Sequence, residues 1–227
     1  MSEQPLAIDQ QPSTRDQATA FVLCPGQGAQ HVGMGRAWFE QRPATAEVFA
    51  AADRALGFAI SEYCFQGPAD QLNRTDIAQP AIYTTSVACY RALAEAGELA
   101  PPAGAAGLSL GEFTALHLAG AFDFLDGLKL VHLRGQAMQE AAQAAPSGMV
   151  ALVGADEQQA QELCDAARGD GVLVPANFNC PGQIVLSGTR DACERAVELA
   201  SKMQLRATPL AVAGAFHSPL MQPAADR

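Results

Sequence analysis

Ser109 lies in Gly107-Leu108-Ser109-Leu110-Gly111, a G-x-S-x-G pattern between a run of small residues and a helix-forming stretch. A serine hydroxyl is a weak nucleophile at its ordinary pKa, so a fold that uses it must expose it on a tight strand-to-helix turn. Gly107 and Gly111 permit such a turn, because a Cβ at either position would crowd the neighbouring backbone. Backbone N–H groups at the start of the next helix would then face a developing oxyanion. The pattern predicts a nucleophile elbow, although small-residue turns that contain serine also occur without any catalytic role.

A nucleophilic serine needs a base, and His217 is the best candidate. It stands between Phe216 and Ser218 in a segment of apolar and small residues. Histidine is the side chain whose pKa suits general base catalysis near neutral pH, although a lone histidine can equally be structural. The remaining histidines occupy a loop, the helix after the elbow and a polar helix face: His31, His117 and His132.

Arg134 is the third residue that could do chemistry. The expected helix from Asp123, a plausible N-cap, to about Ala145 has an apolar arc with Arg134 in its middle. The apolar arc comprises Leu128, Leu130, Val131, Met138, Ala141 and Ala142, and the polar arc Lys129, His132, Gln136, Gln139, Glu140 and Gln143. A buried guanidinium requires an anion. That anion is either an internal Asp or Glu, or a substrate carboxylate held by two parallel hydrogen bonds.

The loop Gly26-Gln27-Gly28-Ala29-Gln30 could line the same cleft. Gln27 offers an amide and a backbone N–H without adding charge, which suits an oxyanion site. The loop lacks the lysine of a phosphate-binding P-loop and does not fit G-x-G-x-x-G, so nucleotide binding is disfavoured.

The elements that must position these residues alternate between helices and strands. The first half predicts a buried strand at 20–24, helices at 43–56 and 79–97, a linker at 101–104 and a helix at 111–119, with the second helix opening at Pro80. From Gly148 the order changes to βαββαβ, the ferredoxin-like arrangement. Its elements are strands at 149–153, 172–177, 183–187 and 207–212 and helices at 157–168 and 191–203.

The segments divide the chain into four expected parts. Residues 1–19 form a flexible N-terminal extension, 20–147 a large α/β subdomain, 148–213 a ferredoxin-like small subdomain and 214–227 a return to the large one. A chain of 227 residues with 49% hydrophobic and only 6% aromatic residues fits close helix-on-sheet packing, hence an α/β fold.

The charge and the cysteine content argue against several classes of partner and cofactor. The net charge is −10, and the 14 Lys and Arg are spread singly, which argues against nucleic acid as a partner. The six cysteines show no C-x-x-C or metal-ligand spacing, so we expect reduced thiols and neither a metal nor a cofactor. No export signal and no membrane-spanning run is apparent, which favours a cytoplasmic protein without membrane contact.

Taken together, the motifs resemble a known family. GQGAQ at 26–30, GLSLGE at 107–112, Arg134-Gly135, NFNCPGQ at 177–183 and Phe216-His217-Ser218 are similar, in order and spacing, to malonyl-CoA:acyl-carrier-protein transacylases and the acyltransferase domains of polyketide synthases. The resemblance covers residues 20 to 227. It implies an α/β-hydrolase-like large subdomain, a ferredoxin-like small one and an active site between them.

The resemblance also implies roles and partners. Ser109 would attack the thioester of malonyl-CoA, His217 would take its proton, and the backbone N–H groups of Gln27 and Leu110 would form the oxyanion hole. Arg134 would hold the malonyl carboxylate, and the phosphopantetheine thiol of acyl carrier protein would then accept the malonyl group for fatty acid or polyketide synthesis. The substrate-binding residues would also include Phe216, Met138, Asn177 and Asn179.

Two family features concern the acyl group, and both favour malonyl. A phenylalanine before His-Ser and a branched aliphatic residue after the nucleophile accompany malonyl rather than methylmalonyl in this family, and here they are Phe216 and Leu110. The physical reason is steric, because a phenyl ring near the α-carbon leaves less room for a methyl branch.

Two departures from the family pattern stand out. Leu108 replaces the histidine that usually precedes the nucleophile, which we expect to alter packing under the elbow. The chain also ends soon after His217, so the C-terminal part of the large subdomain, with the acceptor that orients the His217 ring, is expected to be missing.

Two alternatives therefore stay open: a serine esterase or thioesterase on the same elbow, and an inactive truncated remnant that binds carrier protein. For docking of acidic carrier proteins, the densest cationic candidates are Arg190, Arg195, Lys202 and Arg206.

Overall fold

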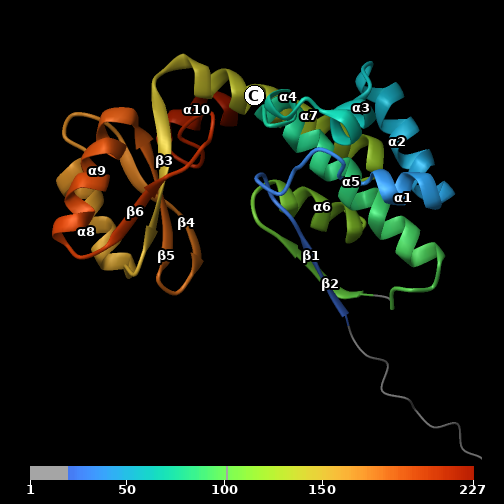
Figure 1. Cartoon of the computed structure of the whole chain (residues 1–227), viewed down its shortest axis with the longest axis horizontal. Helices are drawn as coiled ribbons and strands as arrows, with labels where there is room; N and C mark the ends of the chain where they lie inside the picture. The colour runs from blue at the N-terminus through green and yellow to red at the C-terminus, as the bar shows by residue number, and fades with distance from the viewer. Residues whose placement is uncertain (1–19, 101) are drawn as a thin grey trace, which may run out of the picture.

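The computed structural model describes residues 20–100 and 102–227. Figure 1 shows two parts side by side, one built from the helices and two strands of the first half, the other from a four-stranded sheet with two helices. The expected α/β fold is confirmed. The extension predicted at 1–19 lies outside the described residues.

The first part contains two strands and the helices around them. Its elements are β1 (Ala20–Cys24), α1 (Arg36–Gln41), α2 (Pro43–Leu56), α3 (Ile60–Gln66), α4 (Ala69–Leu72), α5 (Thr75–Glu95), β2 (Pro102–Gly107), α6 (Leu110–Leu118) and α7 (Phe124–Ala144). The short helices α1, α3 and α4 were not predicted, because none is long enough to show a clear period of 3.6 residues.

Strands β1 and β2 pair in parallel, with Cys24 beside Gly107. The prediction of a fully buried first strand is wrong: Phe21 is 71% exposed and Leu23 80% exposed, whereas Cys24 is buried. Successive side chains of a strand point to opposite faces, and within the described residues α6 packs against the pair while the Phe21 face stays open. The predicted linker at 101–104 is also wrong from residue 102 on, since β2 begins there and pairs with the start of β1.

Helix α5 begins earlier than expected, at Thr75, and Pro80 lies inside it rather than at its start. Without an N–H on Pro80, the carbonyl of Asp76 loses its partner four residues along the helix. Burial lowers the pKa of the His132 imidazole on α7, an effect partly opposed by nearby Asp76. His132 is therefore half-buried between helices rather than on a purely polar face.

Helices α5 and α7 pack along one another and form the core of the first part. Asp123 caps α7 as predicted, its carboxylate accepting a hydrogen bond from the N–H of Asp126 at 2.8 Å. Most of the predicted apolar arc of α7 is buried or half-buried, but Leu130 is 45% exposed.

The second part has the predicted order βαββαβ. Its elements are β3 (Ser147–Val153), α8 (Glu157–Ala167), β4 (Leu173–Cys180), β5 (Gln183–Thr189), α9 (Arg190–Lys202) and β6 (Arg206–Pro209). All the strand pairs are antiparallel, and the order across the sheet is β4-β5-β3-β6. Strand β6 is shorter than predicted, ending at Pro209.

The two faces of this sheet pack against different elements. On one face, Val150, Leu152, Ile184 and Leu186 pack in a cluster with α8 and α9. On the other, Met149 and Val185 join Met138 and Ala142 of α7, Phe216 and Met221 in a second cluster. That cluster, together with contacts of α7 to the 3-10 turn Pro219–Met221 and α10 (Gln222–Ala225), connects the two parts.

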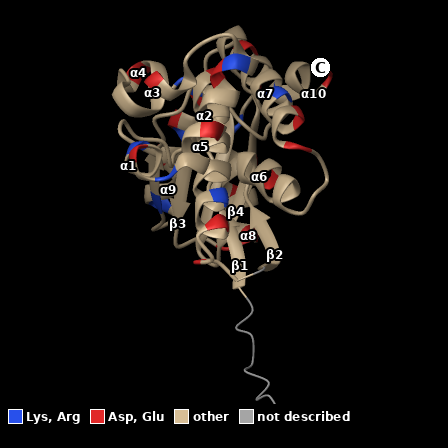
Figure 2. Ribbon diagram, turned by 90° about the vertical axis from the view of Figure 1, so that its right-hand side faces the viewer, with Lys and Arg blue, Asp and Glu red and all other residues tan. Residues whose placement is uncertain are grey.

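Lysine and arginine residues are scattered over many elements in Figure 2, between acidic positions. A search of the described residues finds no helix that is both long and apolar enough to cross a bilayer.

Candidate active site

Ser109 lies on the turn between β2 and α6, with φ 55° and ψ −110°. A serine rarely adopts this backbone conformation, and such strain is typical of a nucleophile elbow. The flanking glycines are required as predicted: a Cβ on Gly107 would overlap the backbone of Gly111, and a Cβ on Gly111 would overlap the carbonyl of Cys24. A Cβ on Gly26 would come within 2.8 Å of the Leu108 carbonyl oxygen, so the glycine-rich loop also lies directly against the elbow.

The structure brings His217 to Ser109 from 108 residues away, with Nε2 of the histidine 3.0 Å from Oγ of the serine. This is hydrogen-bond distance for a nucleophile and its base. His217 itself has φ 59°, a left-handed conformation uncommon for a histidine.

Serine side chains hold the loop that carries His217. Ser187 of β5 donates a hydrogen bond to the carbonyl of Phe216 at 2.6 Å, and Oγ of Ser147 in β3 accepts one from the N–H of Ala215 at 3.1 Å. Ser218 closes the turn by donating to the carbonyl of Ala215 at 2.7 Å. His217 is thus held by the antiparallel sheet, whereas Ser109 is held by β2 and α6.

Arg134 reaches the same serine from α7. Its Nη2 donates to Oγ of Ser109 at 3.0 Å, its Nη1 donates to Oε1 of Gln79 at 2.7 Å, and its guanidinium carbon lies 5.4 Å from the centre of the Phe113 ring. In the described part of the chain, none of the ion pairs involves Arg134. The internal Asp or Glu left open by the sequence is therefore not found among the described residues, and a partly buried cation faces Ser109 with neutral hydrogen-bond partners.

Burial lowers the pKa of both His217 and Arg134. Burial lowers the pKa of the His217 imidazole, and the nearby positive charge of Arg134 lowers this pKa further. Burial also lowers the pKa of Arg134, an effect partly opposed by Glu112. His217 is consequently neutral at pH 7, the state in which Nε2 can accept the proton of Ser109.

The two predicted oxyanion donors lie on either side of the elbow. Leu110 begins α6, where the first N–H groups of a helix lack intrahelical partners, and Gln27 lies in the loop after β1. Within the described residues, neither backbone N–H has a backbone or side-chain acceptor. The Gln27 side chain is directed away to the hydroxyl of Thr75 at 3.3 Å, so the backbone N–H is the group it can offer here.

A cavity of about 220 Å³ opens above Ser109 and is lined by residues from both parts of the structure. The predicted site residues that line it are Gln27, Ser109, Met138, Asn177, Asn179, Phe216 and His217. Arg134 reaches the site through its bond to Ser109, and the Leu110 side chain is fully buried beneath the elbow. Leu108 does not pack under the elbow as expected: it is 60% exposed and lines the cavity, because its backbone lies against Gly26 and its side chain points outward.

Gln79 was missed by the sequence reasoning. This side chain is fully buried and lies between Arg134 and Met138, donating from Nε2 to the sulfur of Met138 at 3.3 Å. The available signal was a single amide within Ala78-Gln79-Pro80-Ala81, a helical segment otherwise made of small apolar residues.

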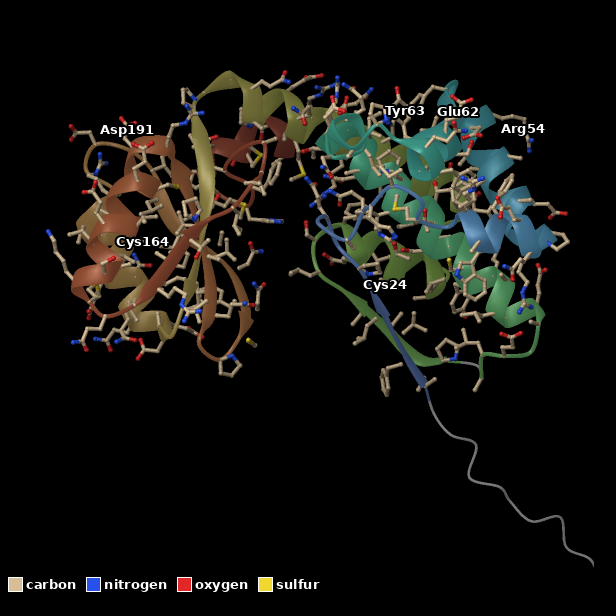
Figure 3. All side chains as sticks on the ribbon, in the orientation of Figure 1. Cys24, Arg54, Glu62, Tyr63, Cys164 and Asp191 are labelled. Carbon is tan, nitrogen blue, oxygen red and sulfur yellow. The ribbon has the colours of Figure 1, made fainter. Side chains whose placement is uncertain are left out.

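The cysteines are not part of this site. All six are free thiols, of which Cys180 is exposed and Cys89 half-buried. Figure 3 shows Cys24 at the end of β1 and Cys164 inside the second part. Burial raises the pKa of the thiol of Cys24, which is paired with Gly107 of the elbow, so this thiol is protonated at neutral pH. Among the described residues, no group of three or more potential metal ligands is found.

The chain belongs to the acyl transferase domain family, whose model matches residues 20–227. This confirms the resemblance inferred from the motifs.

More specifically, the chain is similar to malonyl CoA-acyl carrier protein transacylases. It is 45% identical to that of Bacillus subtilis over 90% of this chain and 65% of the relative, and 44% identical to that of Escherichia coli K12 over 92% and 67%. The crystal structure of the transacylase from Clostridium perfringens superposes with a TM-score of 0.85 at 42% identity, covering 92% of this chain and 66% of that one. The chain thus spans about two thirds of the length of these relatives.

Proposed function

We propose that this chain carries the malonyl-transfer site of an acyl-carrier-protein S-malonyltransferase. The observation that carries the proposal is the arrangement at Ser109, whose hydroxyl contacts both a neutral imidazole and a guanidinium without a carboxylate partner. The first supplies a base, and the second supplies a binding site for a carboxylated acyl group.

The first half-reaction loads the serine. Nε2 of His217 accepts the proton of Ser109 as Oγ attacks the thioester carbonyl of malonyl-CoA, and the backbone N–H groups of Gln27 and Leu110 stabilise the oxyanion. Collapse of this intermediate expels the coenzyme A sulfur, which takes the proton from His217. Arg134 holds the free malonyl carboxylate through two parallel hydrogen bonds and keeps the α-carbon beside Phe216.

The second half-reaction transfers the malonyl group. The phosphopantetheine thiol of acyl carrier protein gives its proton to His217 and attacks the malonyl-serine ester. The tetrahedral intermediate then releases Oγ of Ser109, which recovers the proton, and malonyl-carrier protein leaves for fatty acid or polyketide synthesis. The similar structure named as a malonyl-transacylase in complex with a type II polyketide synthase acyl carrier protein, 39% identical to this chain with a TM-score of 0.86, supports this acceptor.

The same proposal assigns the two parts of the fold. Residues 20–147 would be the α/β-hydrolase-like large subdomain, 148–213 the ferredoxin-like small one, and 214–227 the return of the chain. The sheet order β4-β5-β3-β6 supports the ferredoxin-like assignment. The share of the relatives that this chain spans supports the prediction that further large-subdomain structure belongs to the complete enzyme.

The cationic residues of α9 are less suited to carrier-protein docking than the sequence indicated. Helix α9 packs on the sheet face opposite the cavity, and Arg195 donates to the carbonyls of Ala167 and Arg168 at 2.7 and 2.8 Å. Its positive charge thus stabilises the C-terminal end of α8. Any docking role rests on Arg190, Lys202 and Arg206.

The esterase alternative does not explain the position of Arg134, since a simple ester or thioester offers no carboxylate to a buried guanidinium. The inactive-remnant alternative does not explain the contact between His217 and Ser109. The geometry therefore favours transfer over both.

Intact-mass spectrometry of this chain after incubation with malonyl-CoA tests the proposal. We expect a covalent malonyl adduct on the native chain and none on Ser109→Ala, with loss of the adduct when carrier protein bearing phosphopantetheine is added. An unmodified native chain would contradict the proposed nucleophile, and an adduct discharged equally fast by water alone would favour the esterase.

A further inference from the structure

Gln79 occupies a position where a buried arginine would ordinarily have a carboxylate. It is fully buried in α5, and its Oε1 accepts a hydrogen bond of 2.7 Å from Nη1 of Arg134. A guanidinium in such surroundings is stabilised most strongly by a negative charge. The chain supplies a glutamine, which has nearly the shape of glutamate but no charge.

Both polar atoms of the Gln79 side-chain amide form hydrogen bonds. While Oε1 accepts from Arg134, Nε2 donates to the sulfur of Met138, one helical turn further along α7. Two bonds in opposite directions fix the amide orientation, because an NH₂ group directed at the guanidinium would place donor against donor.

The backbone around Gln79 is held tightly as well. Where α5 meets α7, a Cβ on Gly135 would come within 2.9 Å of the carbonyl oxygen of Thr75, so the helices are in close contact beside Arg134. The N–H of Thr75 donates to Oε1 of Gln139 at 3.0 Å across the same contact. Gln79 is thus presented from a rigid helix, at a fixed distance from Arg134.

We infer that Gln79 is a positioning residue that aims Arg134 at the acyl-binding cavity while leaving its positive charge uncompensated, so that selection of a carboxylated acyl group depends on the neutrality of residue 79. This inference rests on the proposed function. One guanidinium edge is anchored by Gln79 and by the Phe113 ring beneath it, and Nη2 is directed at Oγ of Ser109, where the acyl group will be attached. A carboxylate at position 79 would pair with Arg134 internally and compete with the substrate carboxylate.

The test measures binding rather than turnover. In the Ser109→Ala background, which cannot be acylated, titration calorimetry with malonyl-CoA and with acetyl-CoA gives the preference for the carboxylated ligand. The comparison is repeated with Gln79→Glu, with Gln79→Met, and with Gln139→Glu as a matched control that adds the same charge to a glutamine of the same helix contact. Circular dichroism melting curves verify that each variant is folded.

We expect Gln79→Glu to reduce the preference for malonyl-CoA over acetyl-CoA by roughly 10-fold or more. A change of this size corresponds to the loss of at least one charge-assisted hydrogen bond. Gln79→Met keeps the Arg134 charge but loses the anchor, so the preference should fall less than in Gln79→Glu. Gln139→Glu should change it least, because Gln139 does not contact Arg134. If Gln79→Glu does not fold, a reduced preference in Gln79→Met supports the positioning of Arg134 by Gln79, and an unchanged preference overturns it.

The outcomes separate this inference from the proposed function. Absence of any malonyl preference while Gln79 is present overturns the carboxylate clamp, and the inference with it. A preference that persists in folded Gln79→Glu, or that falls equally in the Met and Glu variants, overturns the role of neutrality at position 79 and leaves the clamp intact.

Discussion

Replacing Arg134 with alanine is the sharpest test of the carboxylate clamp. The side chain places one guanidinium edge beside the nucleophile, 3.0 Å from Oγ of Ser109, in surroundings that burial has partly dehydrated. A malonyl carboxylate held there would gain two charge-assisted hydrogen bonds of about 1.5 to 3 kcal/mol each. Their loss totals about 3 to 6 kcal/mol, which corresponds to roughly a 10²- to 10⁴-fold lower kcat/KM for malonyl-CoA.

The assay compares rates of acyl-enzyme formation from malonyl-CoA and acetyl-CoA by quenched intact-mass measurement. The acetyl group has no carboxylate to lose, so its loading should fall far less in Arg134→Ala. Arg134→Lys is the matched control: it retains the charge but not the planar fork, and should lie between the native chain and Arg134→Ala for malonyl loading. Equal losses for both acyl groups would refute the clamp, because the arginine would then act only through the folding of the elbow or the orientation of Ser109.

Three further predictions concern the base, the acyl pocket and the elbow. Because the charge of Arg134 helps to hold the pKa of His217 below its usual value, Arg134→Ala should raise that pKa and shift the acidic limb of the acetyl-loading pH profile to higher pH; an unmoved limb would contradict the coupling. Phe216→Leu should reduce the discrimination between malonyl-CoA and methylmalonyl-CoA in competition assays by about 10-fold, and an unchanged ratio would exclude the phenyl ring as the steric determinant. Gly111→Ala should lower the free energy of unfolding by about 1 to 3 kcal/mol in urea titrations, whereas Gly148→Ala, whose added Cβ meets no atom within 4 Å, should not; equal effects would contradict the close contact at the elbow.

The sequence was sufficient to predict those candidate site residues whose type and immediate neighbours together indicate a chemical role. The G-x-S-x-G pattern, the arginine in an apolar arc and the histidine in a small-residue loop each indicate a function from their immediate neighbours, and the structure brings Ser109, Arg134 and His217 into contact. The second half of the fold was equally accessible, because its elements are short, regular and separated by clear turns.

The rest depends on contacts that no local pattern encodes. Pro80 was placed at the start of a helix, yet packing of α5 against α7 extends the helix to Thr75 despite the missing N–H. Phe21 and Leu23 look like core residues by type, but burial depends on whether another element covers the face of the strand. Gln79 could not be assigned to Arg134 because the two residues are 55 positions apart and meet only in the folded chain.

The loop anchored by Ser147 and Ser187 has a mechanical consequence. Hydrogen bonds from β3 and β5 tie the backbone next to His217 to the antiparallel sheet, whereas Ser109 is tied to β2 and α6. The contact of 3.0 Å between base and nucleophile therefore joins two separately braced frameworks. A rotation of one part of the structure relative to the other would therefore lengthen the distance between Nε2 of His217 and Oγ of Ser109 before it disturbed the hydrogen bonds within either part.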